Sequence, residues 1–166
     1  LGALTDADLA AYRVEHGLAP GHTALFMGSV EQSKDIGFLR EVVRIAHGRD
    51  ARFRLLVAGR GTQERHLTAS AGTVFVGRVV RREKALALTA SDVLVMPQAI
   101  GLVAVDSLVG GVPLVTRHGR GHGPEADYLQ DGWNSVWLSS TATPGQFARA
   151  LLDLLDDKDR LDRLAD

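Results

Sequence analysis

The feature that most constrains the fold is a regular alternation between short apolar segments and longer segments whose apolar residues recur every three to four positions. Apolar runs of about five residues are typical of strands in a parallel sheet covered on both faces, and the longer periodic segments are typical of helices. The sequence therefore predicts an α/β fold, a doubly wound parallel sheet of the Rossmann-like type. The predicted strands lie within residues 22–30, 52–61, 73–77, 92–97, 112–116 and 134–140.

Helix signals lie between and around these strands. Thr5 is a candidate N-cap for a first helix that ends near Gly17, and a second helix begins at about Asp35. An amphipathic tail starts at Pro144. Three further helices are predicted within residues 62–70, 82–91 and 101–111.

Composition limits the classes of function. The chain has 166 residues and 45% apolar content, which favours one soluble domain over residues 1–166. Lys and Arg number 19 against 20 Asp and Glu, so nothing indicates a general affinity for nucleic acid. The lack of cysteine excludes disulfides, thiolate metal sites and a Cys nucleophile. Without a leader or an apolar run of roughly twenty residues, we expect a cytoplasmic protein.

The loops after the predicted strands are the expected binding site, because ligands of such sheets bind at the carboxyl ends of the strands. These loops are rich in glycine and in polar or basic residues. The turn of Gly101, Leu102 and Val103 opens a helix whose free N–H groups and dipole suit a diphosphate. Lys34 offers a phosphate a positive charge, and Asp106, about one turn into that helix, suits a ribose diol.

Residues of these loops follow a defined order along the chain. The first strand is followed by Gly28 and Ser29, Lys34 comes shortly afterwards, and the second strand precedes Gly59 and Gly61. The later members of the pattern are Gly77, Ser91, Asp92, Pro97, Gln98, Ile100, Gly101, Leu102, Asp106, Gly111, Pro113, Pro124, Glu125, Asp131, Gly132 and Asn134. In order and spacing, residues 22–138 resemble the C-terminal, donor-binding domain of retaining group 1, or family 4-type, glycosyltransferases with the GT-B architecture.

Three of the expected site positions depart from the family pattern. Ser29 stands where the family has Arg, and Gln98 and Asp106 stand at the two Glu positions, with their spacing kept. The resemblance implies a nucleoside diphosphate sugar as donor, with neither a cofactor nor a metal. It implies that Lys34 meets the diphosphate, that Asp106 meets the ribose and that the residue at Val79 lies beside the base.

These implications give a set of expected site residues. Lys34, Gln98 and Asp106 are the expected catalytic residues. The expected nucleotide-binding residues are Gly28, Ser29, Lys34, Gly59, Val79, Gly101, Leu102, Val103 and Asp106. The start at Leu1 indicates a fragment of a longer polypeptide, whose N-terminal domain would bind the acceptor and make any peripheral membrane contact. This domain alone is expected to be inactive.

Several of these residues also have a purely structural interpretation. Lys34 is also typical of a solvated residue at a helix start, and Asp106 of a solvent-facing residue on an amphipathic helix. A cluster of Arg78, Arg81 and Arg82 is typical of a solvated surface, with phosphate contact less favoured. Trp133 and Trp137 are expected to pack in the core or between domains. Glycines around His118 and His122 argue against a helix and hence against a metal site there.

Two other functions remain open from the sequence. The changes at Ser29 and Gln98 are compatible with a non-catalytic nucleotide-binding or scaffold module of the same fold. A nucleotide-sugar epimerase has a similar two-domain architecture and is the third hypothesis. A dinucleotide-binding protein is disfavoured. Its Gly-x-Gly-x-x-Gly motif would begin at Gly59 and Gly61, but Glu64 occupies the position of the third glycine.

Overall fold

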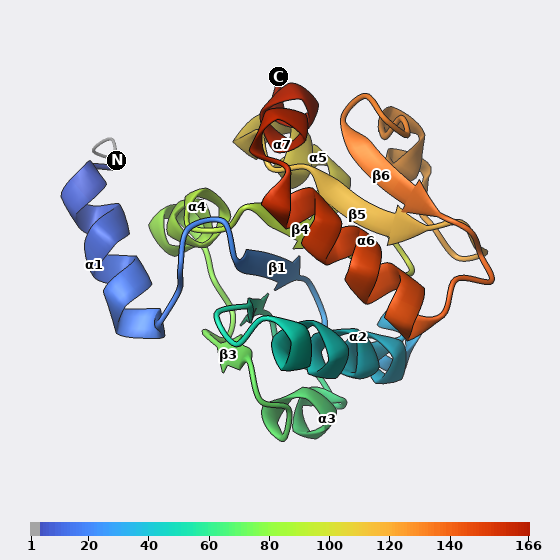
Figure 1. Ribbon diagram of the computed structural model, residues 1–166, viewed down its shortest axis with the longest axis horizontal. Helices are drawn as coiled ribbons and strands as arrows, with labels where there is room; N and C mark the ends of the chain where they lie inside the picture. Colours follow the sequence, from blue (N-terminus) through green and yellow to red (C-terminus); the bar gives the residue numbers. More distant parts are fainter. Residues whose placement is uncertain (1–3) are drawn as a thin grey trace.

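Six parallel strands form one sheet in the order β3-β2-β1-β4-β5-β6 in the computed structural model, which describes residues 4–166 (Figure 1). The central strand β1 pairs with β2 and with β4, so that Leu25 lies beside both Leu56 and Leu94. The strands are β1 Thr23–Met27, β2 Arg54–Ala58, β3 Thr73–Phe75, β4 Val93–Val95, β5 Leu114–Arg117 and β6 Ser135–Leu138. The doubly wound parallel sheet predicted from the sequence is confirmed.

Helices connect and cover the strands at the predicted places. The α-helices are α1 Asp6–His16, α2 Ile36–Arg49, α3 Glu64–Thr68, α4 Arg81–Thr89, α5 Val103–Gly110, α6 Pro144–Asp156 and α7 Lys158–Ala165. Two short 3-10 helices, η1 Gln32–Lys34 and η2 Pro124–Tyr128, lie in loops. None of the helices among residues 4–166 is long and apolar enough to span a membrane.

Local capping explains where several helices begin. Thr5 caps α1 as predicted: its hydroxyl accepts from the Asp8 N–H at 3.2 Å, and the Thr5 N–H donates to the Asp8 carboxylate at 3.0 Å. Thr143 and Gln146 form the same reciprocal arrangement at the start of α6, followed by Pro144 in the first turn. These helix boundaries are therefore set by neighbouring residues in the chain.

The core lies on both faces of the sheet. α2 and α6 pack against each other on one face, and α4 and α5 contact each other on the opposite face (Figure 1). All residues of β1 are buried, which explains why this strand is apolar throughout. Phe26, Phe53 and Phe147 are among the largest fully buried side chains.

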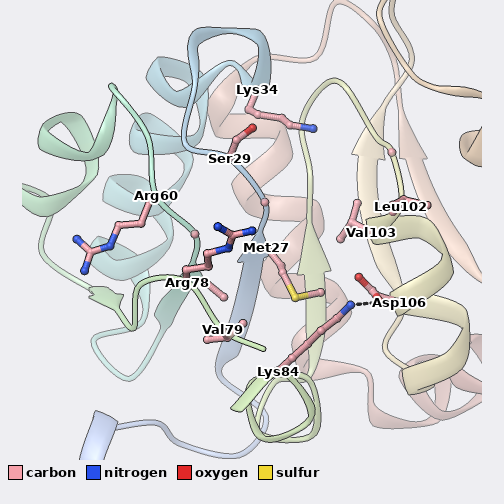
Figure 2. A pocket seen from close by; sticks show the side chains of 14 residues that line it. Met27, Ser29, Lys34, Arg60, Arg78, Val79, Lys84, Leu102, Val103 and Asp106 are labelled. Carbon is pink, nitrogen blue, oxygen red and sulfur yellow. Dashed lines mark ion pairs between the residues drawn. The ribbon is translucent and has the colours of Figure 1, made fainter. Parts of the chain in front are cut away.

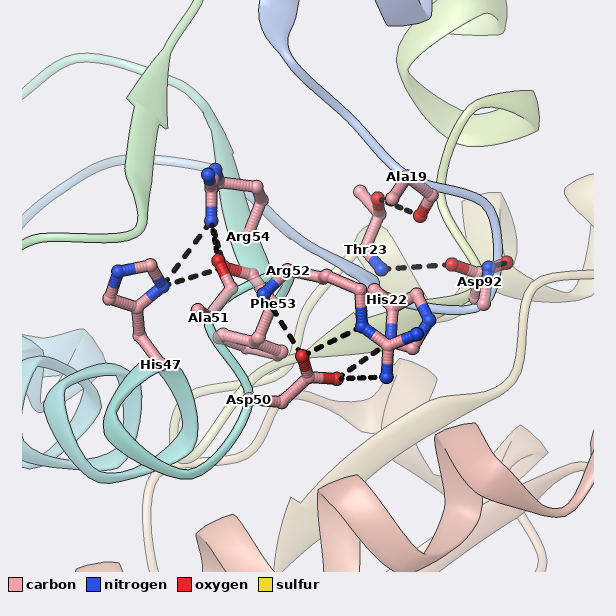
Figure 3. Close-up of polar contacts among 11 residues, drawn as sticks. Ala19, His22, Thr23, His47, Asp50, Ala51, Arg52, Phe53, Arg54 and Asp92 are labelled. Atoms are coloured by element: carbon pink, nitrogen blue, oxygen red, sulfur yellow. Dashed lines mark hydrogen bonds and ion pairs between the residues drawn. The ribbon is translucent and has the colours of Figure 1, made fainter.

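Polar contacts hold the amino-terminal ends of the central strands together, at the edge opposite the strands' carboxyl ends (Figure 3). The Asp92 carboxylate accepts from the Thr23 N–H at 2.9 Å and thereby joins β1 to the start of β4. His22 Nδ1 lies 2.8 Å from the Asp50 carboxylate, which also accepts from Arg52. The Arg52 hydrogen bond is the main cause of a lowered pKa at Asp50. This network fixes the scaffold at the end away from the predicted site.

The strand order creates a switch point between β1 and β4. The chain leaves β1 toward α2 on one face and leaves β4 toward α5 on the other, so the two loops diverge at the carboxyl edge. Such a divergence leaves a crevice, which is the usual ligand-binding position in open α/β sheets.

Candidate functional site

A cavity of about 610 Å³ lies in this crevice, at the carboxyl ends of β1 and β2 and beside the start of α5 (Figure 2). Its size is in the range typical of small-molecule sites. The lining residues are Met27, Gly28, Ser29, Lys34, Ala58, Gly59, Arg60, Arg78, Val79, Lys84, Gly101, Leu102, Val103 and Asp106.

The cavity collects the residues that the sequence predicted for nucleotide binding. Every one of them, from Gly28 in the first loop to Asp106 on α5, lines this cavity. Of the three expected catalytic residues, Lys34 and Asp106 lie here and Gln98 does not. The Gln98 side-chain nitrogen instead lies near Gly121 of the loop after β5, 3.9 Å from where a Cβ on that glycine would be.

Gly59 allows the loops after β1 and β2 to approach closely. A Cβ on Gly59 would lie 1.8 Å from the Gly28 carbonyl oxygen, which no real contact permits. The Gly28 N–H donates to the Ala58 carbonyl at 3.1 Å, and the Val30 N–H donates to the Arg60 carbonyl at 2.9 Å. The glycine after β2 is therefore needed by this backbone packing, which forms one wall of the cavity.

The amino-terminal end of α5 forms the opposite wall. Within residues 4–166, no backbone carbonyl accepts a hydrogen bond from the N–H groups of Gly101, Leu102 or Val103. A Cβ on Gly101 would meet nothing within 4 Å, so the backbone is open at this point. Free N–H groups at a helix start, together with the helix dipole, favour a bound anion.

Lys34 crosses from the loop after β1 to the loop after β4. Its Nζ donates a hydrogen bond to the Ala99 carbonyl. Burial lowers the pKa of the Lys34 ammonium, because the cation has lost part of its hydration. A half-desolvated cation on the wall of a cavity favours an anionic ligand, which would restore the electrostatic stabilisation that water no longer supplies.

Asp106 is paired with Lys84 across the cavity. The Lys84 Nζ of α4 lies 2.5 Å from Asp106 Oδ1 on α5, and Figure 2 shows the two side chains pointing toward each other. Both side chains keep partial solvent exposure, 38% for Lys84 and 24% for Asp106. The second oxygen of Asp106 has no hydrogen-bond partner among the described residues, and so it can accept from a ligand hydroxyl.

Two arginines line the cavity, and one of them is directed into it. Figure 2 shows the Arg78 side chain pointing into the space between the loops, and Arg78 forms no ion pair with the residues that the structure describes. Arg60 points away toward α3, where it pairs with Glu64 at 3.3 Å. Lys34, Lys84 and Arg78 are therefore the three cationic side chains set against the Asp106 carboxylate in the cavity.

Sequence reasoning missed part of this charge. Lys84 lies on α4, which the sequence marked as an amphipathic helix without any sign that it faces α5. Arg78 is exposed, as expected for a solvated surface, and it also lines the cavity, so that phosphate contact stays a prediction. Its position directly after Gly77, in a loop at the carboxyl edge, was the signal that favoured the site.

The two tryptophans and the two histidines of the later loops lie outside the cavity lining. Trp133 is 74% exposed and so does not pack in the core of this domain, while Trp137 is half-buried; packing of Trp133 against another domain stays a prediction. His118 and His122 lie in a loop, as their neighbouring glycines predicted, and both rings contact Trp137. Among residues 4–166 no group of three or more His, Cys, Asp or Glu side chains is arranged to hold a metal ion.

Comparison with known proteins identifies a family. The family model described as glycosyl transferases group 1 matches residues 21–157. No curated protein matches the chain.

Solved structures share the fold at low sequence identity. HepE from Anabaena, crystallised with UDP-glucose, superposes with a TM-score of 0.78 and 16% identity, over 98% of this chain and 46% of HepE. TarM from S. aureus, crystallised with UDP and other ligands, gives 0.76 and 14%, over 89% of this chain and 31% of TarM. The C-terminal domain of the group 1 family protein LpcC from Francisella tularensis gives 0.72 and 14%, over 98% of this chain and 88% of that domain. This chain therefore spans less than half of HepE and TarM.

Proposed function

Because the chain belongs to the group 1 glycosyl transferases, which have the GT-B fold, we propose that residues 1–166 form the donor-binding domain of a retaining glycosyltransferase. The donor is a nucleoside diphosphate sugar. The observation that carries the proposal is the cavity itself, which combines the cationic side chains of Lys34, Arg78 and Lys84 with free N–H groups of α5 and one carboxylate. This set of groups matches a ligand with two phosphates and a diol.

The diphosphate lies against the start of α5 in this proposal. The N–H groups of Leu102 and Val103 donate to phosphate oxygens, and Lys34 supplies a charge from the facing loop. Ser29 stands where the family has Arg, and Arg78 points into the same space from the loop after β3. We infer that Arg78 provides the guanidinium that the first loop lacks.

The nucleoside lies toward Asp106 and Val79. The free oxygen of Asp106 accepts from the ribose hydroxyls, while Lys84 holds the other oxygen and fixes the orientation of the carboxylate. Val79 packs beside the base.

Catalysis follows from the charge on the leaving group. As the bond between sugar and phosphate breaks, negative charge grows on the diphosphate, and Lys34 and the α5 N–H groups stabilise that charge without a metal. Gln98 lies outside the cavity lining, in the loop that precedes α5, and in this proposal it meets the donor sugar. HepE and TarM were crystallised with UDP-containing ligands, which supports a nucleotide donor here.

A second domain completes the enzyme in this proposal. The chain covers 46% of HepE and 31% of TarM, yet 88% of the C-terminal domain of LpcC. We propose that an N-terminal domain of the same polypeptide binds the acceptor, and that the two domains close around the donor. The enzyme acts in the cytoplasm, and any membrane contact is made through that other domain.

The test is a thermal-shift panel with UDP, GDP, dTDP, ADP and CMP. A ligand at 100 times its dissociation constant adds about 2.7 kcal/mol, which raises the Tm of a domain of this size by about 5–10 °C. We expect a shift with at least one diphosphate. No shift at millimolar concentration with any of them supports the non-catalytic scaffold instead, which the changes at Ser29 and Gln98 motivate.

Activity assays separate the remaining alternatives. Without its partner domain, the chain is expected to form no glycosylated product from a nucleotide sugar and an acceptor. Product formed by the chain alone contradicts the need for a second domain. Conversion of the nucleotide sugar without any acceptor identifies an epimerase.

A further inference from the structure

The loop that leads into α5 is held by contacts from two other parts of the chain. Lys34 Nζ donates to the Ala99 carbonyl, and the Gly123 N–H donates to the Ile100 carbonyl at 2.7 Å. The Ile100 N–H donates to His122 Nδ1 at 3.3 Å. Ala99 has a positive φ of 55°, which is strained for an alanine and persists only when surrounding contacts impose it. These contacts therefore determine where the α5 N–H groups point.

The two nitrogens of His122 have different partners, and the partners fix the proton. Nδ1 faces the Ile100 N–H, which can only donate, so Nδ1 must accept. Nε2 lies 3.1 Å from the Arg117 carbonyl, which can only accept, so Nε2 must carry the hydrogen. The imidazole is therefore neutral in the Nε2–H form, and it connects the loop after β5 to the loop before α5.

The surroundings of His122 also favour the neutral ring. Burial is the main cause of a lowered pKa at His122; the hydrogen bond to the Arg117 carbonyl acts in the opposite direction, and electrostatic interactions with His118 and Lys34 lower the pKa further. The Trp137 ring lies edge-on to the imidazole, with centroids 5.5 Å apart. Other titratable groups around this ring are Arg117, whose guanidinium pairs with Asp35, together with Glu125, Asp127 and Asp131.

We infer that His122, as the neutral Nε2–H tautomer, is a positioning residue that holds residues 97–101 so that the α5 N–H groups face the donor diphosphate. The inference rests on the proposed function of the cavity. A proton added at Nδ1 places two N–H donors against each other at Ile100 and releases the loop. Diphosphate affinity consequently decreases as the pH falls through the pKa of His122, which lies below its ordinary value of 6.5.

Two substitutions test the two hydrogen bonds of the His122 ring separately. His122→Asn puts an acceptor oxygen on Cγ, where the imidazole has Nδ1, and so keeps the bond to Ile100. His122→Gln extends an amide toward Arg117 instead and loses that acceptor. His118→Ala is the control, because His118 also contacts Trp137 but forms no hydrogen bond to residues 97–101 among the described residues.

Affinity for UDP, GDP, dTDP and ADP is measured by calorimetry at pH 7.5 and pH 5.5. We expect His122→Gln to weaken diphosphate binding about five- to tenfold, the effect of losing one hydrogen bond, while His122→Asn and His118→Ala stay within about twofold. The decrease in affinity between pH 7.5 and 5.5 should be larger in the wild type than in His122→Asn. Protonation of the ligand itself affects both proteins equally.

Two measurements need no ligand and give separate results. Nitrogen NMR should show the Nε2–H tautomer of His122, and amide exchange at Ile100 should be slow in the wild type and in His118→Ala but faster in His122→Gln. A Nδ1–H tautomer, or unchanged Ile100 exchange in His122→Gln, overturns the inference. If amide exchange at Ile100 is as expected but no diphosphate binds the wild type, the proposed function of the cavity is wrong. The role of His122 in donor binding is then overturned as well, but the hydrogen bond from Ile100 to His122 is still supported.

Discussion

A pair of glycine substitutions tests how the walls of the cavity are built. Gly59 and Gly101 both line the cavity, but the space around them differs. A Cβ on Gly59 would lie 1.8 Å from the Gly28 carbonyl oxygen and 2.9 Å from its carbon, whereas a Cβ on Gly101 would meet nothing within 4 Å. Gly59→Ala must therefore push apart the loops after β1 and β2, while Gly101→Ala adds a methyl group to open space.

The expected magnitudes differ accordingly. Overpacking costs about 1–3 kcal/mol, and loss of the Gly28 to Ala58 hydrogen bond adds about 1 kcal/mol, so Gly59→Ala should lower the free energy of unfolding by about 2–4 kcal/mol. Gly101→Ala should change it by no more than about 0.5 kcal/mol. Its methyl group lies beside the free N–H groups of α5, so we expect diphosphate affinity to fall by about 1.5–3 kcal/mol, the value of one charged hydrogen bond.

Urea unfolding of the wild type and both variants gives the stabilities, and calorimetric titration with nucleoside diphosphates gives the affinities. The two variants should show opposite patterns: Gly59→Ala loses stability, and Gly101→Ala loses affinity at unchanged stability. A Gly59→Ala protein with wild-type stability would refute the close approach of the two loops. Wild-type diphosphate affinity in Gly101→Ala would contradict the proposal that the start of α5 binds the phosphates.

Three further predictions concern charged and polar side chains. Lys34→Ala should weaken diphosphate binding by about 1.5–3 kcal/mol and leave nucleoside binding nearly unchanged, and equal losses in calorimetry would place Lys34 elsewhere. Asp106→Ala should cost about 1–3 kcal/mol of affinity for the bare diphosphate, whereas Gln98→Ala should weaken the nucleotide sugar alone; titration of both variants with both ligands checks this. The hydrogen bond from Arg82 lowers the pKa of Asp8 from 3.8 to about 2. The ionised Asp8 carboxylate therefore stabilises the fold above pH 3.8, and this stabilisation is lost as the pH falls through about 2. Unfolding of Asp8→Asn should therefore depend less on pH between these values than unfolding of the wild type, and an unchanged dependence would contradict the Asp8 to Arg82 pairing.

Much of the fold and part of the site could be predicted from the sequence, because the relevant signals are local. The apolar run of β1 and the amphipathic pattern of α6 follow from neighbouring residues, and so does the cap at Thr5. In a parallel sheet, every loop that follows a strand reaches the same edge. Gly28 and Gly101 could therefore be assigned to one site before their distance was known.

Only the tertiary structure decided which side chains meet across that edge. Lys84 pairs with Asp106 because α4 and α5 cover the same face of the sheet, a contact that no spacing along the chain encodes. The tertiary structure also places Gln98 near Gly121 and outside the cavity lining, even though it lies three residues before Gly101. Periodicity and capping act over a few residues and fix the elements, whereas long-range packing fixes their relative positions, and the site depends on both.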